Sequence, residues 1–232
     1  MPVVLLCHCD GTNGSSAPIV DSSASGHTIT QSVSNAITHT TAQFKFGASS
    51  LNFPVGSHNG LQSVDHADWD FGAGPFTVEA WVRTAGAVVG YYTIVAQGNT
   101  GSGSWWFGHD GNTLYFGYST TGTGLTYITG SHAIPITTWV HLAADRDASN
   151  VLRIYANGVV IGSGSAAATI FNSAVPLSIG ATDLGSSYWG GQLDEIRITK
   201  GTAQYGGAFT PPTGPFGGAA AATQDTRVMV LA

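Results

Sequence analysis

The chain has 232 residues, a formal net charge of −6, 9% charged residues and 43% hydrophobic residues. This hydrophobic fraction excludes a disordered chain, and the absence of a Lys/Arg cluster excludes the basic surface that DNA or RNA binding requires. Glycine and proline are abundant, at 32 and 9 residues, whereas Glu79 and Glu195 are the only glutamates. The sequence therefore has many turn-forming residues and few of the oppositely charged pairs that stabilise exposed helices. This composition favours one domain built from many short strands.

The first apolar segment, Val3 to Cys7, predicts a strand. It is too short to span a bilayer and has no basic flank, so we expect neither a membrane span nor an export signal there. Cys7 and Cys9 lie two residues apart on one strand face, where a disulfide would be strained. We expect both to be buried thiols that pack as small hydrophobic residues.

Alternation of apolar and polar residues then predicts a series of strands along the chain. These segments are Val3 to Cys9, Phe76 to Arg83, Tyr92 to Ala96, Trp105 to Phe107, Thr113 to Tyr118, Trp139 to Asp145, Val151 to Ala156, Leu177 to Ile179 and Gln192 to Thr199. Turn residues predict hairpins at Asp110-Gly111-Asn112 and at Asn157-Gly158. Asp65 to Phe71 predicts one short helical turn that Gly72, Gly74 and Pro75 end.

After Phe216 the alternation stops, so we divide the chain into a domain over 1–216 and a linker and arm over 217–232. Gly217 to Thr223 has the composition of a flexible spacer. Arg227 to Leu231 is apolar and short, and such a strand is stable only when it pairs with a sheet edge. We expect this arm to dock either on its own domain or on a neighbouring subunit.

Several separated segments together resemble laminin-G-like jelly rolls of the concanavalin A-like lectin superfamily. They cover Leu5 to about Phe216 and include VVLLCHCDGTNGS, AQFKFGASSLNF, VDHADWDFGAGPFTVEAWVR, TTWVHLAADRDASNVLRIYANGVVIGSG, PLSIGA and YWGGQLDEIRITKGTAQYGGAFTPPTGPF. The resemblance implies an all-β fold, a two-sheet antiparallel jelly-roll sandwich. The opening and closing segments are similar to domains of bacteriophage and bacterial surface proteins.

Catalytic patterns do not assemble in this sequence. Hydrolases that share the fold use acidic residues alternating along one strand, with the acid and nucleophile about 5 Å apart. Glu79 has no acidic neighbour two or four residues on, and Glu195 is adjacent to Asp194, which points to the opposite sheet face. No serine lies in a nucleophile elbow, and the eight histidines show no metal-ligand spacing beyond His8, which lies between the two cysteines. We therefore expect no enzyme activity, with a glycan hydrolase or lyase as a distant alternative.

The resemblance also implies a structural calcium ion held between the first and last strands. Asp10 and Asp194 match the two aspartates of such a site, and carboxylate oxygens are what Ca²⁺ prefers. The alternative is that Asp10 caps a turn and Asp194 binds a loop backbone.

Adjacent aromatic residues provide the candidate ligand-binding surface. In a strand one member of each pair faces the core and the other faces outward, as for Tyr91 and Tyr92. Exposed aromatic rings stack on sugars, and the same rings are enriched at subunit interfaces, so both uses stay open. Trp69, Trp81 and Trp139 are expected in the core. The candidate residues are Trp105, Trp106, His109, Asp110, Tyr188 and Trp189.

These features predict a non-catalytic display or binding protein. We expect a virion structural component, such as a capsid decoration or fibre, that forms a homo-oligomer or contacts other virion or surface-protein subunits and binds surface glycans. The alternative is a free-standing lectin module of a bacterial surface protein. The corresponding location is the virion surface, or else the cell surface.

Overall fold

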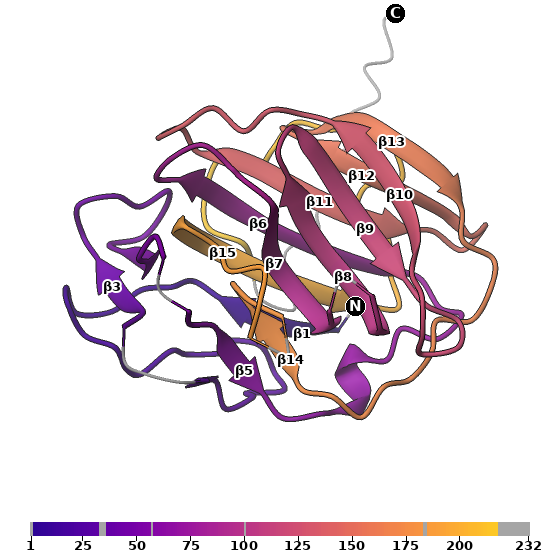
Figure 1. Cartoon of the computed structure of the whole chain (residues 1–232), viewed down its shortest axis with the longest axis horizontal. Helices are drawn as coiled ribbons and strands as arrows, with labels where there is room; N and C mark the ends of the chain where they lie inside the picture. The colour runs from indigo at the N-terminus through magenta and orange to yellow at the C-terminus, as the bar shows by residue number, and fades with distance from the viewer. Residues whose placement is uncertain (1, 33–35, 57, 100, 183–184, 218–232) are drawn as a thin grey trace, which may run out of the picture.

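The computed structural model describes residues 2–32, 36–56, 58–99, 101–182 and 185–217. Two antiparallel sheets pack face to face and form the predicted sandwich (Figure 1). Within the described residues the one helical element is the 3-10 turn η1, Ala67–Trp69, inside the predicted helical segment. No helix in these ranges is long and apolar enough to cross a membrane.

The eight-stranded sheet has the order β13-β12-β11-β6-β15-β4-β3, with β1 also paired to β15. Its strands are β1 (Val3–Cys7), β3 (Thr38–Thr40), β4 (Ser50–Phe53), β6 (Phe76–Thr84), β11 (Val140–Arg146), β12 (Val151–Ala156), β13 (Val159–Ser165) and β15 (Gly191–Lys200). The first and last strands are therefore neighbours, as predicted. A bulge interrupts β15 between Asp194 and Arg197, and Glu195 there has φ of 49°.

The seven-stranded sheet has the order β10-β9-β8-β7-β14-β5-β2. Its strands are β2 (Thr30–Gln31), β5 (Leu61–Ser63), β7 (Tyr91–Gly98), β8 (Gly103–Asp110), β9 (Thr113–Tyr118), β10 (Thr126–Ser131) and β14 (Leu177–Ile179). Both predicted hairpins are present. Gly111 and Asn112 join β8 to β9, and Asn157 and Gly158, both with positive φ, join β12 to β13.

The main core lies between the sheets. Phe76 stacks on Phe71 with a centroid distance of 4.1 Å, and Phe71 stacks on Trp105 at 4.9 Å. Trp69 is buried and Trp81 is 5% exposed, as expected, but Trp139 is only partly buried. Trp81 belongs to a second, smaller cluster on the outer side of the eight-stranded sheet, and Trp139, which precedes β11, packs against this cluster. Cys7 and Cys9 are free and buried, and burial raises the pKa of both thiols.

The segment after β15 covers the outer side of the eight-stranded sheet. The rings of Tyr205 and Phe209 stack with a centroid distance of 3.4 Å, and both lie against Tyr155 of β12. Phe216 is buried against the smaller cluster, and its N–H donates to Glu195 Oε2 at 2.7 Å. Residues 218–232, and with them the predicted apolar arm, lie outside the described residues.

Candidate functional site

The outer side of the seven-stranded sheet carries a group of aromatic side chains from four strands. Cross-strand pairing puts Trp106, Gly117 and Tyr127 in one row across β8, β9 and β10. The next row pairs Gly108 with Tyr115, and the row at the hairpin pairs Asp110 with Tyr91. We call the surface formed by Tyr91, Trp106, Tyr115 and Tyr127 the tyrosine face.

The rings of the tyrosine face contact one another edge to face. Tyr91 lies 5.6 Å from Trp106 at an interplanar angle of 83°, and Tyr115 lies 5.7 Å from Tyr127 at 83°. Such arrangements match the positive edge of one ring to the negative face of the next. Trp106 is fully buried, whereas Tyr91 is 45% exposed and Tyr127 is 36% exposed. The tryptophan therefore supports rings that solvent or a ligand can reach.

Two glycines make room for these rings on the sheet. A Cβ at Gly108 would lie 2.3 Å from Cζ2 of Trp106, so the indole lies directly over this position. A Cβ at Gly117 would lie 2.6 Å from Cε1 of Tyr127. The indole is also fixed at its polar end, since Nε1 donates to Thr93 Oγ1 at 2.9 Å. Packing and hydrogen bonding together hold the base of the tyrosine face in one orientation.

The surroundings of Tyr127 favour the neutral form of its phenol. Burial, followed by the nearby Tyr91 and Tyr115 hydroxyls, raises the pKa of Tyr127. A neutral phenol can both donate and accept a hydrogen bond. Asp110 adds a half-buried carboxylate at the edge of the same outer side. The face thus combines apolar ring surface with a few polar groups, as sugar-binding surfaces require.

The six residues predicted for ligand binding occupy different parts of the molecule. Trp106 and Asp110 lie on the outer side of the seven-stranded sheet, as the alternation rule requires. Trp105 and Trp189 are buried in the main core, and Tyr92 contacts Trp189 from the inner side. These two indoles are therefore not available at the surface, because the inward member of each aromatic pair fills the space between the sheets.

His109 and Tyr188 also lie away from the tyrosine face. His109 is fully buried, and its Nε2 bonds the backbone oxygen of His132 at 2.6 Å. Burial is the main cause that lowers the pKa of His109 to about 4, with the neighbouring His132 charge adding to it. Tyr188 is half-buried, and its ring lies 4.9 Å from that of His58. Of the six predicted residues, only Trp106 and Asp110 therefore lie on the outer side of the seven-stranded sheet, where the tyrosine face is.

The predicted calcium ligands both hold the loop that follows β3. Asp194 Oδ2 accepts from the N–H groups of Lys45 and Phe46 at 2.7 and 3.2 Å. Asp10 Oδ1 accepts from the N–H groups of Ala48 and Ser49 at 2.7 and 3.0 Å. Burial raises the pKa of Asp194 to about 8. The contacts of Asp194 match its alternative of binding a loop backbone, whereas Asp10 binds the same loop rather than its own turn. Calcium at Asp10 and Asp194 stays a prediction.

The two glutamates are held in buried polar contacts in different places. Glu79 accepts from Arg197 at 2.7 Å and contacts His141 at 3.0 Å. Burial alone would raise the pKa of Glu79, but these partners hold it below its usual value. Glu195 contacts His8 at 2.9 Å. Each glutamate therefore has a structural partner of its own, and neither borders the tyrosine face.

Two shallow grooves flank the short strand β2. Thr28 and Thr30 border both grooves, with Pro18 on one side and Gln62 and Asp65 on the other. The described residues that line them include no aromatic side chain. They therefore lack the ring surface that distinguishes the tyrosine face.

Comparison with known proteins identifies the fold family. Residues 55–204 match the model of the family described as Laminin_G_3, concanavalin A-like lectin/glucanases superfamily. No curated protein matches the sequence. Similar solved structures include the binding domain of Paraclostridial Mosquitocidal Protein 1, at 15% identity and a TM-score of 0.63 over 90% of this chain and 50% of that one.

Two botulinum neurotoxin structures are similar to this chain to about the same degree. One concerns type C, described as entering cells through interaction with two ganglioside molecules, at 14% identity and a TM-score of 0.63 over 87% of this chain and 49% of that one. The other is the binding domain of botulinum neurotoxin DC in complex with SialylT, at 13% identity and a TM-score of 0.63 over 87% and 48%. The chain thus spans about half the length of these structures, and the likeness shows the fold alone.

Proposed function

The chain belongs to the concanavalin A-like lectin/glucanases superfamily, and from this premise we propose that it is a carbohydrate-binding module whose ligand contacts the tyrosine face. The tyrosine face carries the proposal, because it combines exposed rings, held in fixed orientations, with neighbouring polar groups that include the Asp110 carboxylate. Rings already held by their neighbours lose little conformational entropy on binding, which favours a specific complex.

The similar solved structures support a binding role in general terms. Two of them are binding domains, one of these is in complex with SialylT, and the third is described as depending on interaction with two ganglioside molecules. We therefore propose surface glycans as the partner class. We propose that binding occurs without catalysis, because Glu79 and Glu195 are each engaged in a separate buried contact and form no acid and nucleophile pair.

Substitution of the exposed rings tests this function. We expect Tyr91→Ala and Tyr127→Ala each to weaken binding to a glycan identified on an array about fivefold, since one aromatic contact contributes about 1 kcal/mol. Phe44→Ala is the matched control, because Phe44 is 42% exposed and lies between β3 and β4. Calorimetry should show unchanged affinity for the control. The proposal would be refuted if the wild type, the two tyrosine variants and the control all bound the glycan equally. It would also be refuted if the wild type gave no signal on the array.

We further propose that the domain is displayed on a virion, with the cell surface as the alternative. The support is the resemblance of the segments Asp10 to Gly14 and Thr199 to Thr213 to domains of bacteriophage and bacterial surface proteins. Such a component is expected to form a homo-oligomer or to contact other virion or surface-protein subunits. Native mass spectrometry of the full chain tests this setting. A monomer that binds glycan would favour the free-standing lectin module instead.

A further inference from the structure

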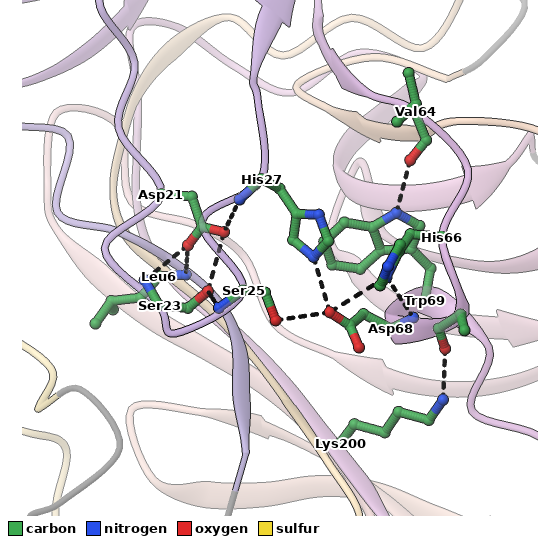
Figure 2. Close-up of polar contacts among 11 residues, drawn as sticks. Leu6, Asp21, Ser23, Ser25, His27, Val64, His66, Asp68, Trp69 and Lys200 are labelled. Atoms are coloured by element: carbon green, nitrogen blue, oxygen red, sulfur yellow. Dashed lines mark hydrogen bonds and ion pairs between the residues drawn. The ribbon is translucent and has the colours of Figure 1, made fainter.

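Two loops bring His27, His66 and Asp68 together at one edge of the sandwich. His27 precedes β2, and the other two residues follow β5, beside η1 (Figure 2). Their ligand atoms, His27 Nε2, His66 Nδ1 and a carboxylate oxygen of Asp68, all lie within 4.8 Å of one another. We call these three residues the His-His-Asp cluster. It is separate from the tyrosine face and from both glutamates.

The polar contacts of the His-His-Asp cluster converge on one oxygen. Asp68 Oδ2 lies 2.8 Å from His27 Nε2, 3.3 Å from His66 Nδ1 and 2.8 Å from Ser25 Oγ (Figure 2). His66 Nδ1 also accepts the backbone N–H of Asp68 at 3.1 Å, as the cap of η1. An accepting Nδ1 carries a lone pair, so it lies beside a carboxylate oxygen that also carries lone pairs. A cation between these atoms turns this unfavourable contact into a favourable one.

The distances from Asp68 to the two imidazoles are close to those between ligands of a small tetrahedral ion. Zinc bonds of about 2.0–2.1 Å to nitrogen and oxygen place neighbouring ligand atoms about 3.3 Å apart. His66 Nδ1 and Asp68 Oδ2 already have this separation, at 3.3 Å. His27 Nε2 lies 2.8 Å from the same oxygen, so an ion requires a small outward rotation of the imidazole. The ion would then replace the cap hydrogen bond, since both use the lone pair of His66 Nδ1.

The surroundings hold the His27 loop in position. Asp21 Oδ2 accepts the backbone N–H of His27 at 2.8 Å, while Asp21 Oδ1 accepts the N–H of Leu6 in β1 at 2.9 Å. The Trp69 ring lies 4.4 Å from the His27 ring and forms a wall of the cluster. Trp69 is itself fixed, because its Nε1 donates to Val64 O at 3.1 Å. These contacts fix the backbone of the His27 loop and one wall beside its imidazole, so the position of this ring does not depend on a bound ion.

From this geometry we propose that the His-His-Asp cluster binds a divalent transition-metal ion of the zinc class. Two imidazole nitrogens and one carboxylate suit zinc, whereas calcium and magnesium require oxygen ligands. Three protein ligands leave one position for water or an exchangeable ligand. The ion would join the loop before β2 to the segment after β5, and so would stabilise this edge of the sandwich.

Titration with zinc chloride tests the site in the full chain. We expect one zinc ion per chain by calorimetry, a raised melting temperature with zinc, and the visible absorption of tetrahedral cobalt when cobalt chloride is used as the probe. His66→Ala should weaken zinc binding at least tenfold. His58→Ala is the matched control, because His58 is also exposed but lies against Tyr188, and it should bind like the wild type.

A second variant separates metal binding from folding. The His66 side chain is half exposed, so His66→Ala should keep the wild-type circular dichroism spectrum and its melting temperature without metal. Asp68→Asn should also weaken zinc binding, because it removes the charge but keeps an oxygen beside His27. No zinc binding by the wild type would overturn the proposal. Equal binding by the wild type and both cluster variants would overturn it as well.

Discussion

Acidification should destabilise the protein through one buried imidazole, that of His109. The side chain is fully buried on the inner side of β8, and burial lowers its pKa to about 4. In the unfolded chain the same group has its ordinary pKa of 6.5. The unfolded state therefore binds a proton first as the pH falls. Stability from neutral His109 is fully present above pH 6.5 and is lost as the pH falls towards 4.

The size of this loss follows from the two pKa values. A pKa difference of one unit between the folded and unfolded states corresponds to about 1.4 kcal/mol. For His109, the free energy of unfolding should therefore fall by about 2 kcal/mol between about pH 7 and about pH 5. Other groups titrate in the same range. Burial raises the pKa of Asp194 to about 8, so the loss of stability from this carboxyl runs the other way, as the pH rises. The total pH dependence therefore does not isolate His109, but a difference between variants does.

His109→Gln supplies the required reference. A glutamine amide reaches roughly as far as Nε2 and can donate to the backbone oxygen of His132, but it does not titrate. Urea unfolding of both proteins at about pH 7 and about pH 5 gives four free energies. We expect the wild type to lose about 2 kcal/mol more than His109→Gln between these pH values, because the effect of Asp194 cancels. Equal pH dependence of the two proteins would show that His109 does not titrate in this range.

Three further measurements test the fold, the loop contacts and the arm. Gly158→Ala should destabilise the protein by several kcal/mol in thermal melts, because a Cβ there would lie on the backbone oxygen of Phe209 and the residue has φ of 79°. Asp10→Ala should lower the melting temperature, since its carboxylate holds two loop N–H groups; a larger drop in calcium than in a chelator would support the predicted ion, and an equal drop would contradict it. Deleting residues 222–232 should lower the melting temperature or reduce the mass of an oligomer, and an unchanged melt and mass would contradict a docked arm.

Alternation and turn chemistry predicted the long strands well. Thr113–Tyr118 and Val151–Ala156 have the predicted bounds, because each lies next to a two-residue turn that fixes the end of the strand. The short strands β2, β3, β4 and β5 were not predicted. Two to four residues show no clear period, and such strands exist because a longer neighbour supplies their hydrogen bonds. β10 was also missed, since its exposed Thr126–Ser131 segment has little apolar content.

The candidate site was only partly visible in the sequence. Alternation along one strand predicted that Trp105 and Trp106 face opposite sides of the sheet, and they do, because this prediction depends on β8 alone. The rings of Tyr115 and Tyr127 come from β9 and β10, so their place beside Trp106 depends on register between strands. The sequence did contain one signal for the aromatic surface. Gly108 in β8 and Gly117 in β9 are glycines at outward-facing positions, and a large ring lies over each of them. The His-His-Asp cluster joins residues about forty apart, and no local spacing marks it.

The two outer sides of the sandwich explain where a ligand can bind. On the eight-stranded sheet the chain's own segment lies over Glu79 and His141, with Phe209 5.6 Å from the His141 ring. Polar groups there are satisfied internally, as Glu79 and Arg197 are. On the seven-stranded sheet the outer rings are instead covered by one another, and Tyr91 and Tyr127 keep more than a third of their surface in solvent. Burying these exposed rings against a ligand would remove apolar surface from water, and this would supply the driving force for the binding that we propose.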